Sequence, residues 1–430
     1  MFLEEIPPEM LSRNFFRALI AQRTARYFCS GQASIETTIK SSRSDPYMAN
    51  PGARLFPSAG NYANLKRTEF VELWCGNAKQ AAIYYEKCFG FQPVAYKGLE
   101  TGSKDTVSYV MRQNDVVVVL TSPLTGRNAE MNDHLIKHGD SVKFIALSVD
   151  DAVHAFNETI KRGAEPYREA PWVVRDEKSG QEVKMAAVRT YGDTVHLFLS
   201  GHESYTGGPF LPGYVAYTGS SSDGPMPTVG LQYIDHMVGN VDWNEMDKWS
   251  NYYKNVFGMD QLISFDDRDI STDYTALKSK VMTNDTGLVK YPINEPAKGM
   301  KKSQIEEYIE FNNGPGVQHI ALATNDIITT VGEMRKRGVE FLRVPDSYYD
   351  QLTDRVGEIE ENVEVLKHLG ILVDRDDKGY LLQIFTKPLT DRPTLFFEII
   401  QRRGGFSFGK GNFKALFVSI EEEQRKRGTL

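Results

Sequence analysis

The stretch Ile234-Asp235-His236-Met237-Val238-Gly239-Asn240 has a counterpart far earlier in the chain, Val71-Glu72-Leu73-Trp74-Cys75-Gly76-Asn77. Each stretch is typical of a short strand that leads into a helix. A glycine follows each of these helices, Gly90 in the first copy and Gly258 in the second. Glycine in this place is a common signal for the end of a helix. The pair therefore predicts one structural unit that is used twice.

The similarity between the two copies resumes further along the chain. Residues 142–147 match residues 317–322, and residues 194–198 match residues 394–398. Runs rich in β-branched residues lie between these anchors and predict further strands. A spacing this long excludes a solenoid repeat and indicates a duplicated domain. We therefore expect an α+β fold with two tandem domains, each built from two modules of a strand, a helix and further strands.

The domain boundaries follow from the same comparison. The run Ser220-Ser221-Ser222-Asp223-Gly224-Pro225 is typical of a linker. It separates an N-terminal domain over residues 67–220 from a C-terminal domain over residues 221–430. Residues 1–66 resemble neither copy, and we expect them to form a disordered leader. Between Met10 and Ser34 this leader has four arginines and no acidic residue, a pattern typical of an organellar presequence, although three glutamates precede it.

The composition is that of a globular protein. The 430 residues are 41% hydrophobic and 25% charged, with a formal net charge of −7. No block rich in lysine and arginine stands out, which argues against nucleic acid as a partner. No run approaches the roughly 20 apolar residues that span a bilayer. Cys29, Cys75 and Cys88 are irregularly spaced, which argues against a disulfide framework and against a thiolate zinc site.

The repeat also exposes a candidate metal site in the second copy. His236, His319 and Glu398 stand at matched positions of three predicted strands. Two buried imidazoles and a buried carboxylate cost free energy unless a partner satisfies them, and a divalent cation is such a partner. The matched positions of the first copy are apolar: Leu73, Phe144 and Phe198. The sequence thus predicts one metal ion per chain, held by the second copy alone.

Two neutral imidazoles and one carboxylate leave coordination positions open. This is the facial arrangement of non-haem iron(II) oxygenases, and the same ligands suit a zinc ion with a bound water. The ligand types alone leave both readings open. Amide and aromatic residues that stand near these strands in sequence can orient a phenol or carboxylate and enclose an aromatic ring, namely Asn294, Gln318, Gln383 and Phe385. No further histidine stands near the ligands, so we expect metal-centred chemistry and assign no separate acid or base.

The C-terminal end predicts a helix with glycines before it. Asn412 is suited to the N-cap position. An apolar stripe at helical spacing follows it, made of Phe413, Leu416, Phe417 and Ile420. This helix is either an ordinary terminal helix that packs on the core or a lid that excludes water from the site.

Five motifs of this chain resemble those of the 4-hydroxyphenylpyruvate dioxygenase family, which belongs to the vicinal-oxygen-chelate superfamily. They are IDHMVGNV at 234–241, GVQHIA at 316–321, GILVDRD at 370–376, FEIIQR at 397–402 and GKGNF at 409–413. The resemblance runs from about residue 67 to the C-terminus. Two departures are the long leader and Ser407, where the family usually has glycine.

The resemblance implies two tandem barrel-like vicinal-oxygen-chelate domains of paired βαβββ modules, of which only the C-terminal domain is catalytic. It implies one Fe(II) per chain, bound by His236, His319 and Glu398. It implies a substrate pocket at Ser279, Asn294, Gln304, Gln318, Gln383, Phe385, Phe408, Asn412 and Phe413. The implied reaction converts 4-hydroxyphenylpyruvate and dioxygen to homogentisate and carbon dioxide, in tyrosine and phenylalanine catabolism.

Three other readings stay open. 4-Hydroxymandelate synthase shares fold, metal and substrate but hydroxylates the benzylic carbon; that family tends to have a smaller aliphatic residue at the position of Phe385 and to lack the proline at Pro292. A zinc- or manganese-dependent isomerase or hydrolase would use the same fold. A metal-free binding module is the non-enzymatic reading. Relatives suggest a homodimer or homotetramer, and the expected compartment is the cytoplasm, or the mitochondrion if the leader is a presequence from Met10.

Overall fold

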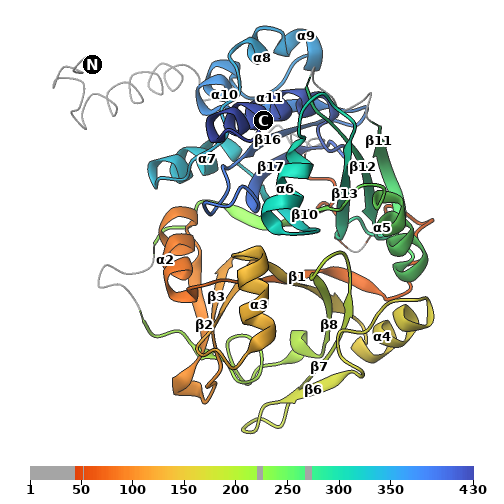
Figure 1. Ribbon diagram of the computed structural model, residues 1–430, viewed down its shortest axis with the longest axis vertical. Coiled ribbons are helices and arrows are strands. Elements are labelled where there is room, and N and C mark those ends of the chain that lie inside the picture. Colours follow the sequence, from red (N-terminus) through yellow and green to blue (C-terminus); the bar gives the residue numbers. More distant parts are fainter. Residues whose placement is uncertain (1–43, 52, 220–225, 267–273) are drawn as a thin grey trace, which may run out of the picture. The chain divides into compact units, whose positions relative to one another are not determined.

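The computed structural model describes residues 44–51, 53–219, 226–266 and 274–430 (Figure 1). The predicted linker at residues 220–225 and the presequence-like run lie outside them. The first of two mixed sheets contains β1 Leu65–Trp74, β2 Gln92–Lys97, β3 Thr106–Gln113, β4 Val116–Pro123, β5 Ser141–Val149, β6 Trp172–Arg175, β7 Glu182–Arg189, β8 Val195–Ser200 and β9 Val215–Ala216. The second contains β10 Leu231–Asn240, β11 Asp260–Phe265, β12 Ala276–Thr283, β13 Lys290–Ala297, β14 Gly316–Thr324, β15 Leu372–Arg375, β16 Tyr380–Phe385 and β17 Phe396–Arg403.

Each sheet consists of two modules that meet at a central antiparallel pair. The strand order is β6-β7-β8-β5-β1-β4-β3-β2-β9 in the first sheet and β11-β12-β13-β10-β14-β17-β16-β15 in the second. The central pairs are β1 with β5 and β10 with β14. In every module the first strand pairs in parallel with the last one, after a helix and two intervening strands. The expected α+β fold of paired βαβββ modules is confirmed.

The helices connect and cover these strands. They are α2 Ala78–Phe89, α3 Ala129–His138, α4 Ala152–Lys161, α5 Met246–Tyr252, α6 Gln304–Asn312, α7 Ile327–Lys336, α8 Ser347–Asp350, α9 Leu352–Val356, α10 Val363–Leu369 and α11 Phe413–Arg427. Short 3₁₀ turns lie at Leu99–Thr101, His202–Ser204 and Lys410–Asn412, and a π-turn at Tyr253–Phe257 extends α5. Gly90 and Gly258 adopt the left-handed conformation after the two matched helices, as predicted. Among the described residues, none of the helices has the length and apolarity needed to cross a membrane.

The two sheets share a hydrophobic core and a backbone connection. The rings of Phe89 in α2 and Phe397 in β17 meet edge to face at a centroid distance of 5.2 Å. The buried side chain of Gln113 accepts hydrogen bonds from three consecutive backbone N–H groups, those of Val229, Gly230 and Leu231. Because one amide oxygen satisfies three buried donors, the entry of the chain into β10 is fixed against the first sheet.

Residues 44–64 differ from the expected disordered leader. Tyr47, Ala59 and Ala63 are buried, and strand β1 begins at Leu65, before the predicted boundary. The composition of this stretch is polar, but a few apolar side chains suffice to attach it to the folded part of the chain. Below, residues 44–51 are called the N-terminal arm.

Acid is expected to destabilise this fold through two buried histidines. Burial lowers the pKa of His196 to about 3, and it does the same for His134. In the unfolded chain a histidine takes up its proton near pH 6.5, so below that pH the unfolded state binds more protons than the native state. Stability therefore falls with decreasing pH, by up to about 1.4 kcal/mol per pH unit for each ring, until about pH 3.

Urea unfolding at a series of pH values between about 7.5 and 5 measures this slope. His196→Phe keeps the ring volume next to Tyr253, whose hydroxyl still has Thr190 as a partner, and it is expected to flatten the dependence by up to about 1.4 kcal/mol per pH unit. Equal slopes in the two proteins would show that His196 is not the titrating group.

Candidate metal centre

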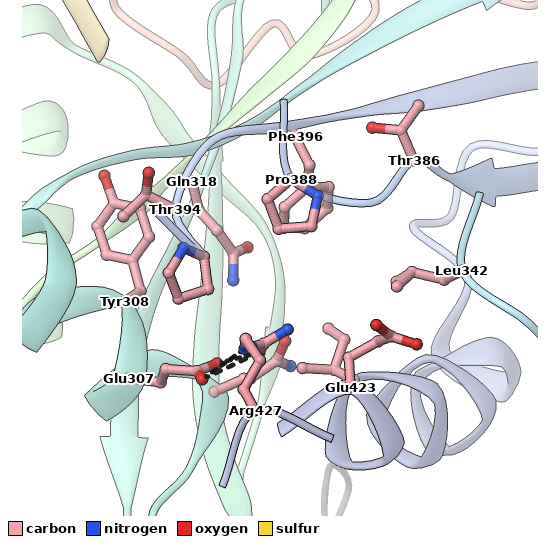
Figure 2. Close-up of a pocket in the computed structure, with 13 residues that line it drawn as sticks. Glu307, Tyr308, Gln318, Leu342, Thr386, Pro388, Thr394, Phe396, Glu423 and Arg427 are labelled. Carbon is pink, nitrogen blue, oxygen red and sulfur yellow. Dashed lines mark hydrogen bonds and ion pairs between the residues drawn. The ribbon is translucent and has the colours of Figure 1, made fainter. Parts of the chain in front are cut away.

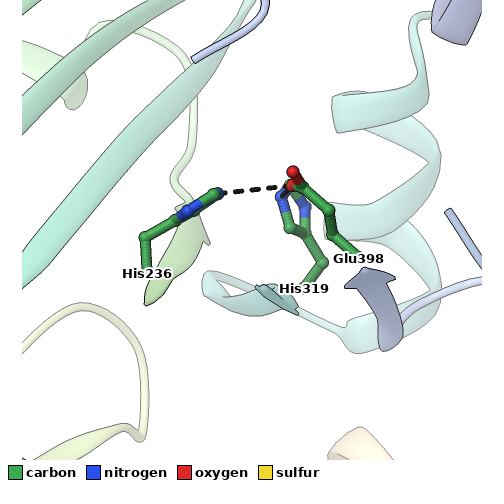
Figure 3. Close-up of side chains that lie close together, drawn as sticks. All are labelled: His236, His319 and Glu398. Atoms are coloured by element: carbon green, nitrogen blue, oxygen red, sulfur yellow. Dashed lines mark ion pairs between the residues drawn. The ribbon is translucent and has the colours of Figure 1, made fainter. Parts of the chain in front are cut away.

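Three adjacent strands bring the predicted ligands together. His236 lies on β10, His319 on β14 and Glu398 on β17, and Ala321 of β14 pairs with both His236 and Glu398. All three side chains are buried. One donor atom from each lies within 4.8 Å of the others, and Oε2 of Glu398 is 3.3 Å from Nε2 of His236 and 3.4 Å from Nε2 of His319 (Figure 3). Residues far apart in sequence thus converge on one point.

Hydrogen bonds on the far side of each ring aim the imidazoles at this point. Nδ1 of His236 is 2.7 Å from a carboxylate oxygen of Asp235, and Nδ1 of His319 is 2.9 Å from the amide oxygen of Gln318. If each Nδ1 carries the proton, Nε2 is left as the free donor atom, which is the arrangement that metal-binding histidines need.

The electrostatics of the site keep the carboxylate ionised. Burial alone would raise the pKa of Glu398, but His236 and His319 outweigh it and lower that pKa to about 2. Oε1 of Glu398 is buried and has no hydrogen-bond partner among the described residues. A buried anionic carboxylate with one oxygen near two imidazole nitrogens and the other without a donor fits a divalent cation as the missing partner.

The ligands line a small cavity of about 40 Å³. Four of the predicted substrate-binding residues line the same cavity: Ser279, Asn294, Phe385 and Phe408. Phe408 meets the His236 ring edge to face at 5.0 Å, and Phe385 meets the His319 ring at 5.9 Å. The remaining walls of the cavity are apolar: Val238, Phe265, Val281, Pro292 and Leu416.

Of the other predicted substrate residues, four are not among those that line this cavity: Gln304, Gln318, Gln383 and Asn412. Gln304 and Gln318 line a second cavity, next to the end of α11, in which Arg427 pairs with Glu307 (Figure 2). Gln383 is buried on β16, and its side-chain amide packs against Gly409. Asn412 occupies the N-cap position of α11, as predicted, but its side chain makes no capping hydrogen bond; its amide oxygen accepts a hydrogen bond from Tyr348 instead. The side chain of Phe413 lies outside the described part of the structure.

Two residues next to the ligands were missed by the sequence analysis. Phe396 stacks on the His319 ring at 4.9 Å with an interplanar angle of 22°. Asp235, whose carboxylate is hydrogen bonded to His236 and to Arg402, stood in the quoted motif without a role. The signal that could have identified Asp235 was an acidic residue in a predicted strand, directly before a predicted ligand.

The predicted counterparts of the ligands in the first copy need a correction at two positions. Phe70 pairs with Ala146 as His236 pairs with Ala321, and Ala146 pairs with Leu197 as Ala321 pairs with Glu398. The counterparts are therefore Phe70, in place of Leu73, and Leu197, in place of Phe198. Phe144 keeps its predicted place as the counterpart of His319 in the first copy. Phe70, Phe144 and Leu197 belong to one hydrophobic cluster, so an apolar trio does replace the polar one.

Comparisons with known proteins agree with this division of the chain. A family model described as hydroxyphenylpyruvate dioxygenase, HPPD, N-terminal, matches residues 60–207. A model described as the glyoxalase/bleomycin resistance protein/dioxygenase superfamily matches residues 233–384. Both halves are thus of the vicinal-oxygen-chelate type.

Similar proteins match the chain over most of its length. The chain is 48% identical over 379 residues to 4-hydroxyphenylpyruvate dioxygenase of Danio rerio. The matched region covers 87% of this chain and 94% of that protein. The chain is 47% identical over 390 residues to the protein of the same name from Neurospora crassa, with 86% and 94% covered. Among solved structures, a triple mutant of 4-hydroxymandelate synthase from Streptomyces coelicolor has a TM-score of 0.73 and 30% identity, over 84% of this chain and 99% of that chain.

Proposed function

Because the chain belongs to the 4-hydroxyphenylpyruvate dioxygenase family, we propose that it converts 4-hydroxyphenylpyruvate and dioxygen to homogentisate and carbon dioxide. The observation that carries the proposal is the buried trio of His236, His319 and Glu398 in the C-terminal half, in which Oε1 of Glu398 has no hydrogen-bond partner among the described residues. We assign one Fe(II) per chain to it. The metal, when bound, supplies the activation of dioxygen that amino-acid side chains cannot provide.

The residues around the trio would bind and orient the substrate. Phe385 and Phe408 offer two aromatic walls for a phenol ring. Ser279 and Asn294 sit on the paired strands β12 and β13, and their polar groups can hold a hydroxyl or carboxylate without adding charge. The apolar remainder of the wall excludes water. No side chain is assigned as a separate acid or base, because the 2-oxo acid of the substrate provides the group that is oxidised.

Entry of the substrate requires α11 to move. The cavity of about 40 Å³ holds little more than one water molecule, whereas an aromatic 2-oxo acid needs a pocket of roughly 300 Å³ or more. Leu416 of α11 forms one wall, and Gly409 and Gly411 precede the helix. We therefore assign the lid role to α11, and Gln304, Gln318, Gln383, Asn412 and Phe413 to the enlarged pocket that opens when it shifts.

The broader assignments follow from the same proposal. The reaction places the chain in tyrosine and phenylalanine catabolism, with residues 67–220 as a non-catalytic domain and 221–430 as the catalytic one. We propose a homodimer or homotetramer in the cytoplasm, with the mitochondrion as the alternative. Cell fractionation with and without residues 1–43 would decide the compartment.

The reaction is tested by anaerobic reconstitution with Fe(II), followed by 4-hydroxyphenylpyruvate, oxygen and chromatography of the product. We expect homogentisate and equimolar oxygen uptake. If 4-hydroxymandelate were the product, the chain would have the activity of 4-hydroxymandelate synthase instead. This activity is the second candidate because of the similarity to the 30% identical solved structure. Turnover with zinc in place of iron, without oxygen uptake, would overturn the oxygenase assignment.

The Phe385→Ile variant is expected to change the product. Phe385 is a cavity wall beside His319, and a smaller aliphatic side chain there leaves the substrate free to present its benzylic carbon. We expect the ratio of 4-hydroxymandelate to homogentisate to rise by on the order of 10-fold or more. The same chromatography measures it. Val281→Ile, at another wall of the cavity, is the control, and an unchanged ratio in Phe385→Ile would remove Phe385 from the specificity determinants.

A further inference from the structure

A buried cluster of charges lies directly behind His236. Nε and Nη2 of Arg402 donate to the two carboxylate oxygens of Asp235 at 2.8 and 2.9 Å, and Nζ of Lys290 lies 3.8 Å from the same carboxylate. All three side chains are buried. Asp235 also binds Nδ1 of His236. Two cations thus share one anion in the protein interior, where an excess charge is costly unless other groups compensate for it.

The N-terminal arm supplies that compensation. The ring of Tyr47, which is fully buried, lies 3.5 Å from Nζ of Lys290 and 5.1 Å from Cζ of Arg402, measured to the ring centroid. Both cations therefore face the negative side of one aromatic ring. Asp45 adds a carboxylate at the border of the cluster, where it accepts a 2.6 Å hydrogen bond from the hydroxyl of Tyr233, 3.3 Å from Asp235.

The same arm holds the segment that leads to α11. The hydroxyl of Tyr47 donates to the carbonyl of Phe406, and the two rings meet edge to face at 5.3 Å. The backbone N–H of Gly404 donates to the carbonyl of Ser44. Two residues after Phe406, the ring of Phe408 rests against His236. The arm thus contacts both the charge cluster and the segment that confine the His236 ring.

The backbone of Gly287 packs closely against the Tyr47 ring. Gly287 lies in the turn between β12 and β13 with φ +77°, and a Cβ atom there would come within 2.6 Å of the Tyr47 ring. Nζ of Lys290 is held from this turn as well, by the carbonyl of Gly287 at 2.7 Å. Because the Tyr47 ring is closely packed, it restricts the positions of the Lys290 and Arg402 cations that face it.

We infer that Tyr47 is a positioning residue of the metal site, which acts through Lys290, Arg402 and Asp235 to fix the ring of His236. The inference rests on the proposed function in one respect, that His236 binds the metal. Tyr47 itself touches neither substrate nor metal. Its role differs from that of an ordinary core aromatic residue, because removal of the aromatic face must weaken metal binding by more than the loss of packing explains.

Cobalt(II) binding to the full-length protein tests this role without turnover. Tyr47→Leu keeps an apolar side chain but removes the aromatic face, and we expect Co(II) affinity to fall by about 10- to 100-fold, with an altered d–d absorption spectrum. Tyr47→Phe keeps the face and loses only the hydrogen bond to Phe406; its affinity is expected to stay within about threefold of wild type. Arg54→Ala, in the same N-terminal stretch, removes an exposed guanidinium that pairs with the buried Asp285, and it is the matched control with wild-type affinity.

Thermal unfolding separates positioning from packing. If Tyr47 positions the site, Tyr47→Leu reduces the rise in melting temperature caused by Co(II), in addition to any loss in the metal-free protein. Wild-type affinity and spectrum in Tyr47→Leu would overturn the inference, as would an equal loss in Tyr47→Phe. If Tyr47→Leu does not fold, Asp45→Asn repeats the titration at a partly exposed position, with a loss of a few-fold expected and wild-type affinity counting against the inference. Failure of the wild-type protein to bind Co(II) would overturn the metal site itself.

Discussion

Glu398→Ala is expected to lower turnover by on the order of 10³-fold or more, because the carboxylate is the anionic ligand of the site and a bound metal contributes several kcal/mol to the transition state. Without it, two neutral imidazoles are left to hold a dication. The rate of oxygen uptake and the bound iron, measured on the same sample, check this result. His319→Ala is expected to behave alike.

The fold of the Glu398→Ala variant is expected to survive. The polar contacts of the Glu398 carboxylate within the described residues are those to His236 and His319, and Oε1 has none. The melting temperature of the metal-free variant should therefore stay close to that of the metal-free wild type. Glu398→Asp, which keeps the charge but shortens the side chain, is the graded control. Retained iron and near-normal turnover in Glu398→Ala would remove Glu398 from the ligand set.

The fold could be predicted from the sequence because the two copies of the repeat can be compared with each other. Gly90 and Gly258 mark the same helix end in both copies, and the structure gives both the left-handed conformation. His236, His319 and Glu398 were found for the same reason, since three polar residues at matched strand positions require a common partner. The inference needed only the order of the strands and not their register.

The register is what the sequence alone left undetermined. Bulges interrupt the pairing of β1 with β5 between Thr68 and Phe70, and that of β10 with β14 between Ile234 and His236. A bulge adds a residue to one strand, and a shift by one residue turns a side chain to the opposite face. The motif alignment is displaced by three residues on β1 and by one on β8, both odd numbers, so it selected Leu73 and Phe198, whose side chains belong to the other core cluster.

The N-terminal arm was missed for a different physical reason. Its sequence is polar and rich in turn-forming residues, and periodicity finds no helix or strand in it. Its attachment depends on contacts with distant strands, such as those of the Tyr47 ring with Lys290 and Arg402. Such contacts exist only once the second sheet has formed, so no local sequence pattern predicts them.

Asp235→Ala is expected to destabilise the metal-free protein by about 3–5 kcal/mol, because it leaves a buried cation without its partner. Burial alone would raise the pKa of Asp235, but Arg402 and Lys290 outweigh it and hold that pKa well below its ordinary value. The carboxylate is therefore ionised at neutral pH, and its loss exposes Arg402 and Lys290 to mutual repulsion. Urea unfolding of the metal-free protein measures the loss.

A double variant distinguishes the two tasks of Asp235. Replacing a buried ion pair by apolar side chains of similar volume is often neutral for stability, so Asp235→Leu combined with Arg402→Met is expected to regain most of the free energy of unfolding. Metal affinity should not return, because Nδ1 of His236 still lacks the acceptor that orients the ring. If affinity recovered together with stability, Asp235 would serve only to balance the charge of Arg402. If neither recovered, Lys290 would be the cation that most needs the carboxylate.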